Sequence, residues 1–392
     1  MAISKNIDRY QVEQTFDLQP LKIQQIFRSA NGGTVRKQVR LGNELTEKDP
    51  AISQAWSVRV AGIASCPWEI VGNTEHARFI EQTLRNIQPA YSSGLSSFSE
   101  LLQFLQSSVM HGFALAQTEW RAGGSRIDGF RIFSQSLFSF VDSDLPYFEG
   151  QDGSGNIKPQ YPKWIYHTST NSRDSEPLRS GIVRPLAYLY AFRRHIQIEY
   201  LSGLEQYGKP QPFVGVEGYL YDDENENKQA IEEMFQTMTY NGYGLYNKDA
   251  MSIEFPTADS GFDVQNFLSY LEWTEKQIFR IILGQDSTSS SDNSNRSTAQ
   301  VHNLVRADML ASDAKAVEET VNNQIIKPLY EATFGASIEK PVFRFRLKGV
   351  TEIKEMSDVL KILNEAGYSV DENTVSERLG FKVSKKEVEN VD

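Results

Sequence analysis

Cysteine is almost absent from this chain of 392 residues, because Cys66 is the only one. A single cysteine excludes a disulfide within the chain and a zinc site built from several thiolates. The histidines lack the spacing of metal ligands and lie at His76, His111, His167, His195 and His302. The sequence therefore predicts no metal and no other cofactor, in a chain made in a reducing cytoplasm.

Long apolar runs and positive charge are also scarce. No run of 18 apolar residues occurs, and residues 1–8 contain no apolar core, so we expect neither a membrane span nor a signal peptide. Lys and Arg number 40 against 51 Asp and Glu, which gives a formal net charge of −11. Tight binding of nucleic acid needs a basic face and is not expected, whereas a surface that DNA passes without sticking is compatible with this charge.

Catalytic motifs are missing as well. The chain has no Gly-x-x-x-x-Gly-Lys-Ser/Thr phosphate loop, Gly-x-Ser-x-Gly elbow, His-Glu-x-x-His or Gly-x-Gly-x-x-Gly motif. Two acidic clusters are candidates for a divalent cation: Asp142 with Asp144, and Asp222 with Asp223 and Glu224. The first follows a predicted strand and the second begins a predicted helix, where acidic groups complement the helix dipole. We interpret both clusters as structural and predict that the protein is not an enzyme.

What is present is typical of a folded protein, with 40% apolar and 11% aromatic residues over a length that suggests two or three domains. Apolar spacing predicts an α+β fold that is mainly helical with a small β-rich portion. The expected helices cover 19–47 with a turn at 31–33, then 50–65, 75–87, 96–110, 185–207, 226–240, 262–284, 298–334, 352–366 and 371–379. Asp49-Pro50 opens the helix 50–65, because proline is tolerated in the first turn, and Gly284 ends the helix 262–284. The expected strands cover 68–71, 113–120, 127–141, 163–168, 212–221, 250–255 and 342–348.

Two basic patterns leave alternatives open. In the strand 342–348 two faces alternate. The apolar face carries Phe343, Phe345 and Leu347, and the basic face carries Arg344, Arg346 and Lys348. Residues 193–195, Arg-Arg-His, lie inside a predicted helix. Either set could face DNA or an acidic partner, but we favour solvated or ion-paired faces, which are the ordinary arrangement for half-buried elements.

The most informative segment is the polar tract 285–297, rich in Ser, Asn and Asp, between the two most strongly helical stretches. Ser297 and Gln300 have the spacing of a capping box, which predicts that the second helix begins at 298. Composition alone favours a disordered surface connection. Two firm helix ends around the tract favour instead a loop that is presented to a partner.

Six short blocks in a fixed order resemble the portal proteins of Mu-like phages. They are 49–52 with Arg59 and 66–70; 111–115 with 118–120; 180–186; 205–210; 281–285 before the polar tract; and Ala299 with His302 and 323–329. Together they span about residues 18–335, most of the chain. One departure is that the family's threonine-rich, glycine-containing sequence after Gly284-Gln285 is replaced here by Asp286 and a Ser/Asn run.

The resemblance implies a dodecameric ring at one vertex of a capsid, assembled in the host cytoplasm and retained in the virion. Double-stranded DNA would pass through the ring without being tightly bound. The implied partners are other copies of this chain, the large terminase subunit, a head–tail adaptor or neck protein, and the major capsid protein. No membrane and no cofactor are implied.

The resemblance also implies a division of the chain. The expected parts are a wing at 1–225, stem helices at 226–240 and 262–284, a clip at 241–261, a tunnel loop at 285–297, a long helix and return strand to the wing at 298–350, and a crown-like helical end at 351–392. The tunnel-loop residues expected to face DNA are Asp286, Ser289, Ser290, Ser291, Asn293, Asn295 and Arg296. The clip residues expected to bind partners are Tyr243, Tyr246 and Lys248.

Two other classes of protein stay open on the sequence. One is a metal-dependent nuclease that uses the acidic clusters at Asp142, Asp144 and Asp222. The other is a different virion ring such as a neck adaptor, which is normally a much shorter chain.

Overall fold

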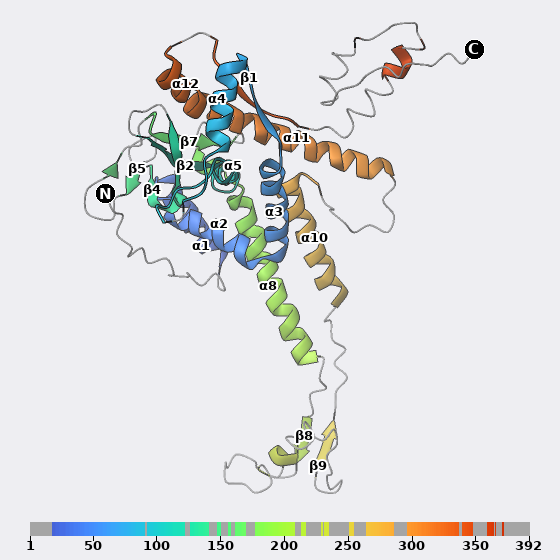
Figure 1. Cartoon of the computed structure of the whole chain (residues 1–392). Coiled ribbons are helices and arrows are strands. Elements are labelled where there is room, and N and C mark those ends of the chain that lie inside the picture. Colours follow the sequence, from blue (N-terminus) through green and yellow to red (C-terminus); the bar gives the residue numbers. More distant parts are fainter. Residues whose placement is uncertain are drawn as a thin grey trace. The chain divides into compact units, whose positions relative to one another are not determined.

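The computed structural model describes residues 18–90, 92–121, 126–140, 147–149, 156–157, 161–169, 177–207, 213–216, 229, 231–234, 251–254, 264–285, 296–336, 339–347, 359–363, 365 and 371. The chain forms two compact units, one of residues 1–188 with 276–392 and one of residues 189–275 (Figure 1). None of the helices in the described ranges is long and apolar enough to cross a membrane.

The larger unit begins with three helices, α1 (Pro20–Asn31), α2 (Arg36–Lys48) and α3 (Pro50–Ala64). The predicted turn at 31–33 separates the first two. Asp49 caps α3, because its Oδ1 accepts hydrogen bonds from the backbone N–H groups of Ala51 and Ile52. These predicted helices are confirmed.

A three-stranded antiparallel sheet lies at the centre of this unit, in the order β3 (Ile127–Ile132), β2 (Phe113–Trp120), β7 (Trp164–Thr168). The first six residues of β2 are all buried, as expected for a strand covered on both faces. The predicted strand 127–141 is interrupted, because a 3-10 turn at Gln135–Leu137 follows β3. After it, β4 (Phe138–Ser139) joins β5 (Tyr147–Glu149) and β6 (Asn156–Ile157) in a second small sheet.

Three further helices complete the core. They are α4 (Thr74–Arg85), α5 (Phe98–Leu105), which begins with a Ser97–Glu100 capping box, and the short α6 (Ser108–His111). The predicted helix 96–110 was therefore wrong as one unbroken element. Both α5 and α6 pack on the central sheet, and α4 packs on the strand Trp68–Val71. The main core cluster includes Ile63, Ile80, Leu84, Leu101, Phe130, Val317 and Phe343, all almost fully buried.

Two strands that lie far apart in the sequence, β1 (Trp68–Val71) and β10 (Val342–Phe345), form an antiparallel pair. The predicted alternation of β10 is confirmed, because Phe343 and Phe345 are buried and Val342 and Arg344 are exposed. The strand ends before Leu347, which is 37% exposed, so its predicted place on the apolar face was wrong.

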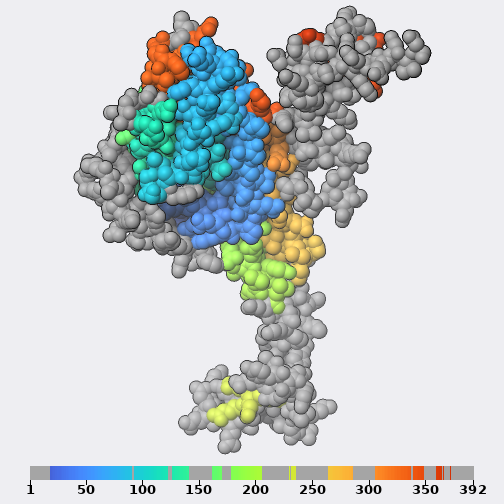
Figure 2. All heavy atoms as spheres, in the orientation of Figure 1, coloured from blue at the N-terminus to red at the C-terminus, as the bar shows by residue number. Residues whose placement is uncertain are grey.

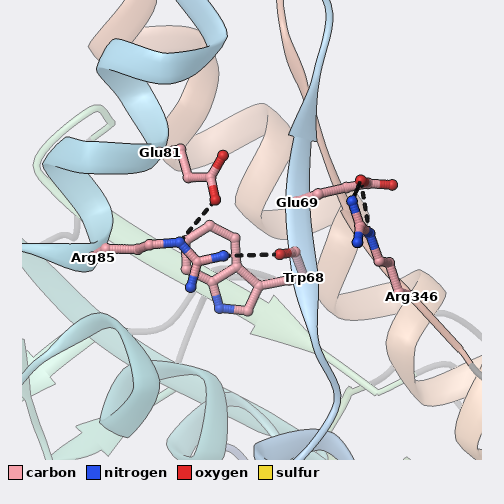
Figure 3. Close-up of polar contacts among 5 residues, drawn as sticks. All are labelled: Trp68, Glu69, Glu81, Arg85 and Arg346. Carbon is pink, nitrogen blue, oxygen red and sulfur yellow. Dashed lines mark hydrogen bonds and ion pairs between the residues drawn. The ribbon is translucent and has the colours of Figure 1, made fainter. Parts of the chain in front are cut away.

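Charged side chains flank β1 on both sides (Figure 3). Arg85 of α4 lies over the Trp68 ring, 4.0 Å from its centroid, and pairs with Glu81 at 2.8 Å. On the other side, Arg346 pairs with Glu69. Arg346 is thus ion-paired within the chain, and Arg344 is exposed, as we favoured for the basic face of the predicted strand 342–348.

The long C-terminal helical stretch is not one helix. It consists of α11 (Arg296–Val321), a π-helical turn at Asn322–Ile326, and α12 (Lys327–Phe334). The helix begins at Arg296, so the predicted cap at Ser297 was wrong and Ser297 lies in the first turn. In Figure 2, α12 in orange borders α4 in blue, where His76 stacks on Phe334 with ring centroids 4.0 Å apart.

The smaller unit contains the C-terminal part of α8 (Val183–Tyr207), the antiparallel pair β8 (Phe213–Val216) and β9 (Met251–Glu254), and the N-terminal part of α10 (Val264–Leu283). α8 and α10 lie side by side, with Arg193 Nη2 3.8 Å from Glu275 Oε2 and the rings of Tyr200 and Phe267 5.9 Å apart.

Further helical residues are α7 (Pro177–Ser180) and residues 229, 231–234, 359–363 and 365. Most of the predicted helix 226–240 lies outside the described residues, as does most of the predicted last pair, 352–366 and 371–379.

Candidate functional site

The predicted tunnel-loop residues fall almost entirely outside the described part of the chain. Of these residues, the structure describes only Arg296, which is the first residue of α11. The others lie outside the described ranges: Asp286, Ser289, Ser290, Ser291, Asn293 and Asn295. The predicted clip residues Tyr243, Tyr246 and Lys248 also lie outside the described ranges. What the structure does show is how the two ends of the polar tract are held.

The acidic clusters at Asp142, Asp144 and Asp222 lie outside the described ranges too. Among the residues that are described, no group of three or more His, Cys, Asp and Glu side chains is placed to hold a metal ion.

The end of α10, just before the polar tract, lies in close contact with α11. Gly284 ends α10 with φ +74°, and its N–H donates to the Arg280 carbonyl at 3.0 Å. A Cβ on Gly284 would lie 2.5 Å from Met309 Sδ and 3.0 Å from a methyl carbon of Val305. Glycine is therefore required both for the backbone conformation and for the close approach of the two helices.

Arg59 of α3 joins the same two helices. Its Nε and Nη2 donate to the two carboxylate oxygens of Asp313 on α11, both at 3.0 Å. Its Nη1 donates to the Ile282 carbonyl, in the last turn of α10, at 2.7 Å. Gln106 donates to Asp313 as well. All three polar side chains are buried, with Arg59 9%, Asp313 5% and Gln106 1% exposed.

This buried polar group was missed at the sequence level, although a signal was present. On α3 the buried positions Ile52, Ala55, Arg59 and Ile63 follow helical spacing, so an arginine occupies the apolar face. A charged residue on such a face needs a buried partner. The partner, Asp313, is 254 residues away and could not be identified from α3 alone.

A small apolar cavity lies beside Arg59. Its volume is about 30 Å³, and its lining includes Val58, Gly62, Ile282, Met309 and Leu310. Ligand sites for small molecules are roughly ten times larger. The cavity has room for about a water molecule and does not indicate a substrate site.

The π-helical turn after α11 covers the open edges of two sheets. The Asn322 side chain donates to the Phe343 carbonyl at 3.0 Å and accepts from the Phe343 N–H at 2.7 Å. Gln324 bonds Tyr166 of β7 in the same way, at 2.7 Å and 2.8 Å. Each amide replaces a neighbouring strand, and Glu318 accepts from the Phe345 N–H at 2.6 Å. These contacts fix α11 and α12 to the sheets.

His111 and His167 are buried in the larger unit. His111 Nε2 is 3.1 Å from the Asn43 side-chain oxygen, and His167 Nδ1 is 2.7 Å from the Thr320 hydroxyl on α11. Burial lowers the pKa of each imidazole to about 4, so both are neutral near pH 7. Their surroundings indicate packing positions rather than metal ligands.

The fold is similar to that of chains in two solved structures. The chain is similar to a chain in the virion of a native gene transfer agent particle, with a TM-score of 0.60, 12% identity, and 88% of this chain and 94% of that chain covered. It is similar to a chain in the neck of a native gene transfer agent particle computed with C12 symmetry, with a TM-score of 0.60, 12% identity, and 92% and 99% covered. The mainly helical α+β portal fold that the sequence predicts is confirmed.

Residues 39–381 match the family described as the portal protein of Mu bacteriophage, and the chain belongs to this family. It is 22% identical over 391 residues to the Mu-like prophage FluMu protein gp29 of Haemophilus influenzae, covering 94% of this chain and 71% of that protein. It is 23% identical over 367 residues to the portal protein of Escherichia phage Mu, covering 92% and 70%. The resemblance carried by the six sequence blocks is confirmed, and the family supports a phage portal function.

Proposed function

We propose that this chain is the subunit of a homododecameric portal ring, located at one vertex of a phage capsid. Double-stranded DNA is packaged and ejected through the ring. Membership of the Mu portal family supports this role, and the similarity to a neck structure computed with C12 symmetry supports twelve copies. A structural role is favoured over an enzymatic one, and neither a cofactor nor a membrane takes part.

The main observation in support of a ring is the apolar surface that stays exposed on α8 and α10. On α8, Leu201 is 57% exposed and Phe192 46%, and on α10 Trp273 is 50% exposed. Ile198, Leu204, Val264 and Leu268 are exposed as well. Contiguous exposed apolar side chains are typical of protein contacts. In a closed ring each subunit uses two different faces, one toward each neighbour, and a pair of helices offers two such faces.

The division of the chain follows from this arrangement. We assign the stem to α8 and α10, because these helices lie side by side, and not to 226–240 with α10 as first expected. The β8–β9 pair with the residues between these helices is then the clip. The clip, including Tyr243, Tyr246 and Lys248, docks the large terminase subunit and later the head–tail adaptor or neck protein.

The remaining parts take the other roles. Most of the larger unit is the wing, which meets the major capsid protein, and 351–392 is a crown-like end. The tract from Asp286 to Arg296 faces the DNA channel. Its hydroxyl and amide side chains contact a moving polyanion without locking to it, and the net charge of −11 limits phosphate binding along the rest of the chain. Assembly takes place in the host cytoplasm.

Electron microscopy and mass photometry of the purified protein test this proposal. We expect closed rings of twelve copies with a central channel. Leu201→Ser with Trp273→Ser should shift the protein towards smaller species, since both side chains would lose apolar contact area. The matched control is Leu21→Ser on α1, which removes a leucine that is 64% exposed outside this helix pair. Monomers alone at micromolar concentration would reject the ring.

A cleavage assay separates the portal from the nuclease alternative. We expect no cleavage of DNA when Mg²⁺ or Mn²⁺ is added to the protein. Metal-dependent cleavage that is lost in Asp142→Ala or Asp222→Ala would instead establish the enzyme.

A further inference from the structure

We propose that Arg59 is a positioning residue for the DNA-facing tract. Its buried guanidinium sets the angle between α10 and α11, and thereby the place to which residues 286–295 are delivered. The inference rests on the proposed function in one respect, namely that the tract faces DNA. The angle itself is a property of the chain without DNA.

The contacts of Arg59 are directional. The two parallel bonds to Asp313 use the planar edge of the guanidinium, and such bidentate pairs fix orientation as well as distance. The third bond goes to the Ile282 carbonyl, one of the last carbonyls of α10 that have no partner within the helix. One rigid group on α3 therefore holds the two helices that bracket the tract.

Because of the position of Asp313 along α11, a small shift of the Arg59–Asp313 pair produces a larger shift at the start of α11. Residues 296–312 extend beyond it towards the tract, a length of about 26 Å at 1.5 Å per residue. On the other side, the amide pairs of the π-helical turn begin at Asn322, about 13 Å away. If the amide pairs at Asn322 act as a pivot, a small displacement at Asp313 is roughly tripled at Arg296, which lies about 39 Å from Asn322.

Close packing alone does not explain a buried ion pair at this place. Met309 against Gly284 and Leu310 against Gly62 already set how near the helices lie, with distances of 2.5 Å and 3.1 Å to an added Cβ. Replacing a buried ion pair by apolar side chains is often neutral or stabilising. A gain in stability is therefore a weak explanation for the buried Arg59–Asp313 pair. Apolar side chains could fill the same space, but they would not fix the relative orientation of the helices as the hydrogen bonds do.

The test is a distance measurement in variants that stay folded. In a Cys66→Ser background, spin labels are placed at Lys276→Cys on α10 and Thr298→Cys near the start of α11. The main variant is the triple apolar replacement Arg59→Met, Gln106→Leu and Asp313→Leu, which leaves no buried charge unpaired. The second is Arg59→Lys, which keeps the charge but not the bidentate pair.

We expect a narrow distance distribution in the parent, a broadened and shifted one in the triple variant, and an intermediate one in Arg59→Lys. The midpoint of thermal unfolding should change little in the triple variant. An unchanged distribution in both variants would overturn the inference, as would a distribution that broadens only in step with loss of thermal stability. If the triple variant does not fold, the Arg59→Lys distribution decides alone.

DNA packaging is measured separately with the same variants, without labels. We expect less DNA packaged per ring by the triple variant, because its tracts are misplaced. A shifted distance with normal packaging would show that Arg59 sets the helix angle while the tract does not act on DNA. That outcome counts against the proposed role of the tract and not against the positioning of α11.

Discussion

At the residue scale, two amide side chains form the backbone hydrogen bonds that a neighbouring strand would otherwise form. Gln324 and Asn322 each satisfy one N–H and one C=O on the outer edge of a sheet, on β7 and β10 respectively. Unpaired edges of this kind are sites where chains associate wrongly. Covering these edges from within the chain limits the ways in which copies of the chain can meet.

Gln324→Ala should therefore be costly although the residue is only partly buried. It would leave the N–H and C=O of Tyr166 without partners, at roughly 1–3 kcal/mol each, so we expect a loss of about 2–6 kcal/mol in the free energy of unfolding. Urea unfolding followed by circular dichroism measures the change. Gln82→Ala on the exposed face of α4 is the control and should be nearly neutral. A Gln324→Ala protein as stable as this control would contradict the edge-covering role.

The buried histidines predict how stability depends on pH. The ordinary pKa of 6.5 applies in the unfolded chain, whereas burial lowers the pKa of His111 and His167 to about 4 in the fold. Between these values the unfolded chain binds more protons, so the free energy of unfolding falls as pH falls from about 6.5 to about 4. Each histidine contributes at most about 1.4 kcal/mol per pH unit.

Replacement of one histidine isolates this effect. His167→Gln keeps a polar partner for Thr320 but cannot take up the proton, so stability should depend less steeply on pH in that window. Urea unfolding at several pH values gives the slope, and His195→Gln, at an exposed position on α8, is the control. An unaltered slope in His167→Gln would mean that His167 becomes protonated without unfolding.

At the element scale, the end of α10 matters because the polar tract starts there. Gly284 combines a positive φ with close contact to Met309. The sequence predicts the helix end from Gly284 as a C-terminal glycine, and the structure adds that the same glycine lets α11 approach. The two requirements can be separated by substitution.

Gly284→Ala should cost more than a matched glycine substitution elsewhere. Gly94→Ala, at φ +66°, places its Cβ 3.4 Å from a flexible arginine and carries mainly the backbone cost of about 1–2 kcal/mol. Gly284→Ala carries that cost and a further 1–3 kcal/mol or so from overpacking against Met309. Adding Met309→Ala should recover part of the second cost. Equal unfolding free energies for the two alanine variants would show that the helices separate without penalty.

At the scale of the whole molecule, charge decides how the proposed channel treats DNA. The chain is acidic overall, and if the tract faces DNA as proposed, Asp286 and Asp292 would oppose phosphate while Arg296 would attract it. Net attraction should be slight, which suits a conduit that must release its cargo. DNA movement through the proposed channel should therefore require that the tract carries little net positive charge.

Converting Ser289, Ser290 and Ser291 to lysine should slow or stop DNA packaging, because each lysine adds a phosphate contact. These contacts weaken with salt, so the defect should be larger at about 50 mM than at about 200 mM salt. The uncharged control converts the same serines to glutamine, with similar side-chain length. Normal packaging by the lysine variant at low salt would mean that the tract does not face DNA.

Several element boundaries follow directly from local signals in the sequence. Asp49 before Pro50 gave the start of α3, Gly284 gave the end of α10, and the alternation of Phe343 and Phe345 gave the buried face of β10. Each of these signals is local, because a cap, a glycine or a period of two acts within a few residues. The start of α11 was misplaced at Ser297, since helix ends fray and the competing signals differ by one or two residues.

The sequence by itself therefore determined the family, the mainly helical α+β class, the acidic balance and most element boundaries, because these depend on composition, order and local propensity. Only the tertiary structure decided that Arg59 meets Asp313 and Ile282, that a π-helical turn interrupts the long helix, and that α8 lies beside α10. The Arg59 contacts join residues 254 and 223 positions apart. No local pattern encodes such a pairing, since the partner is chosen by which buried polar groups the folded core brings together.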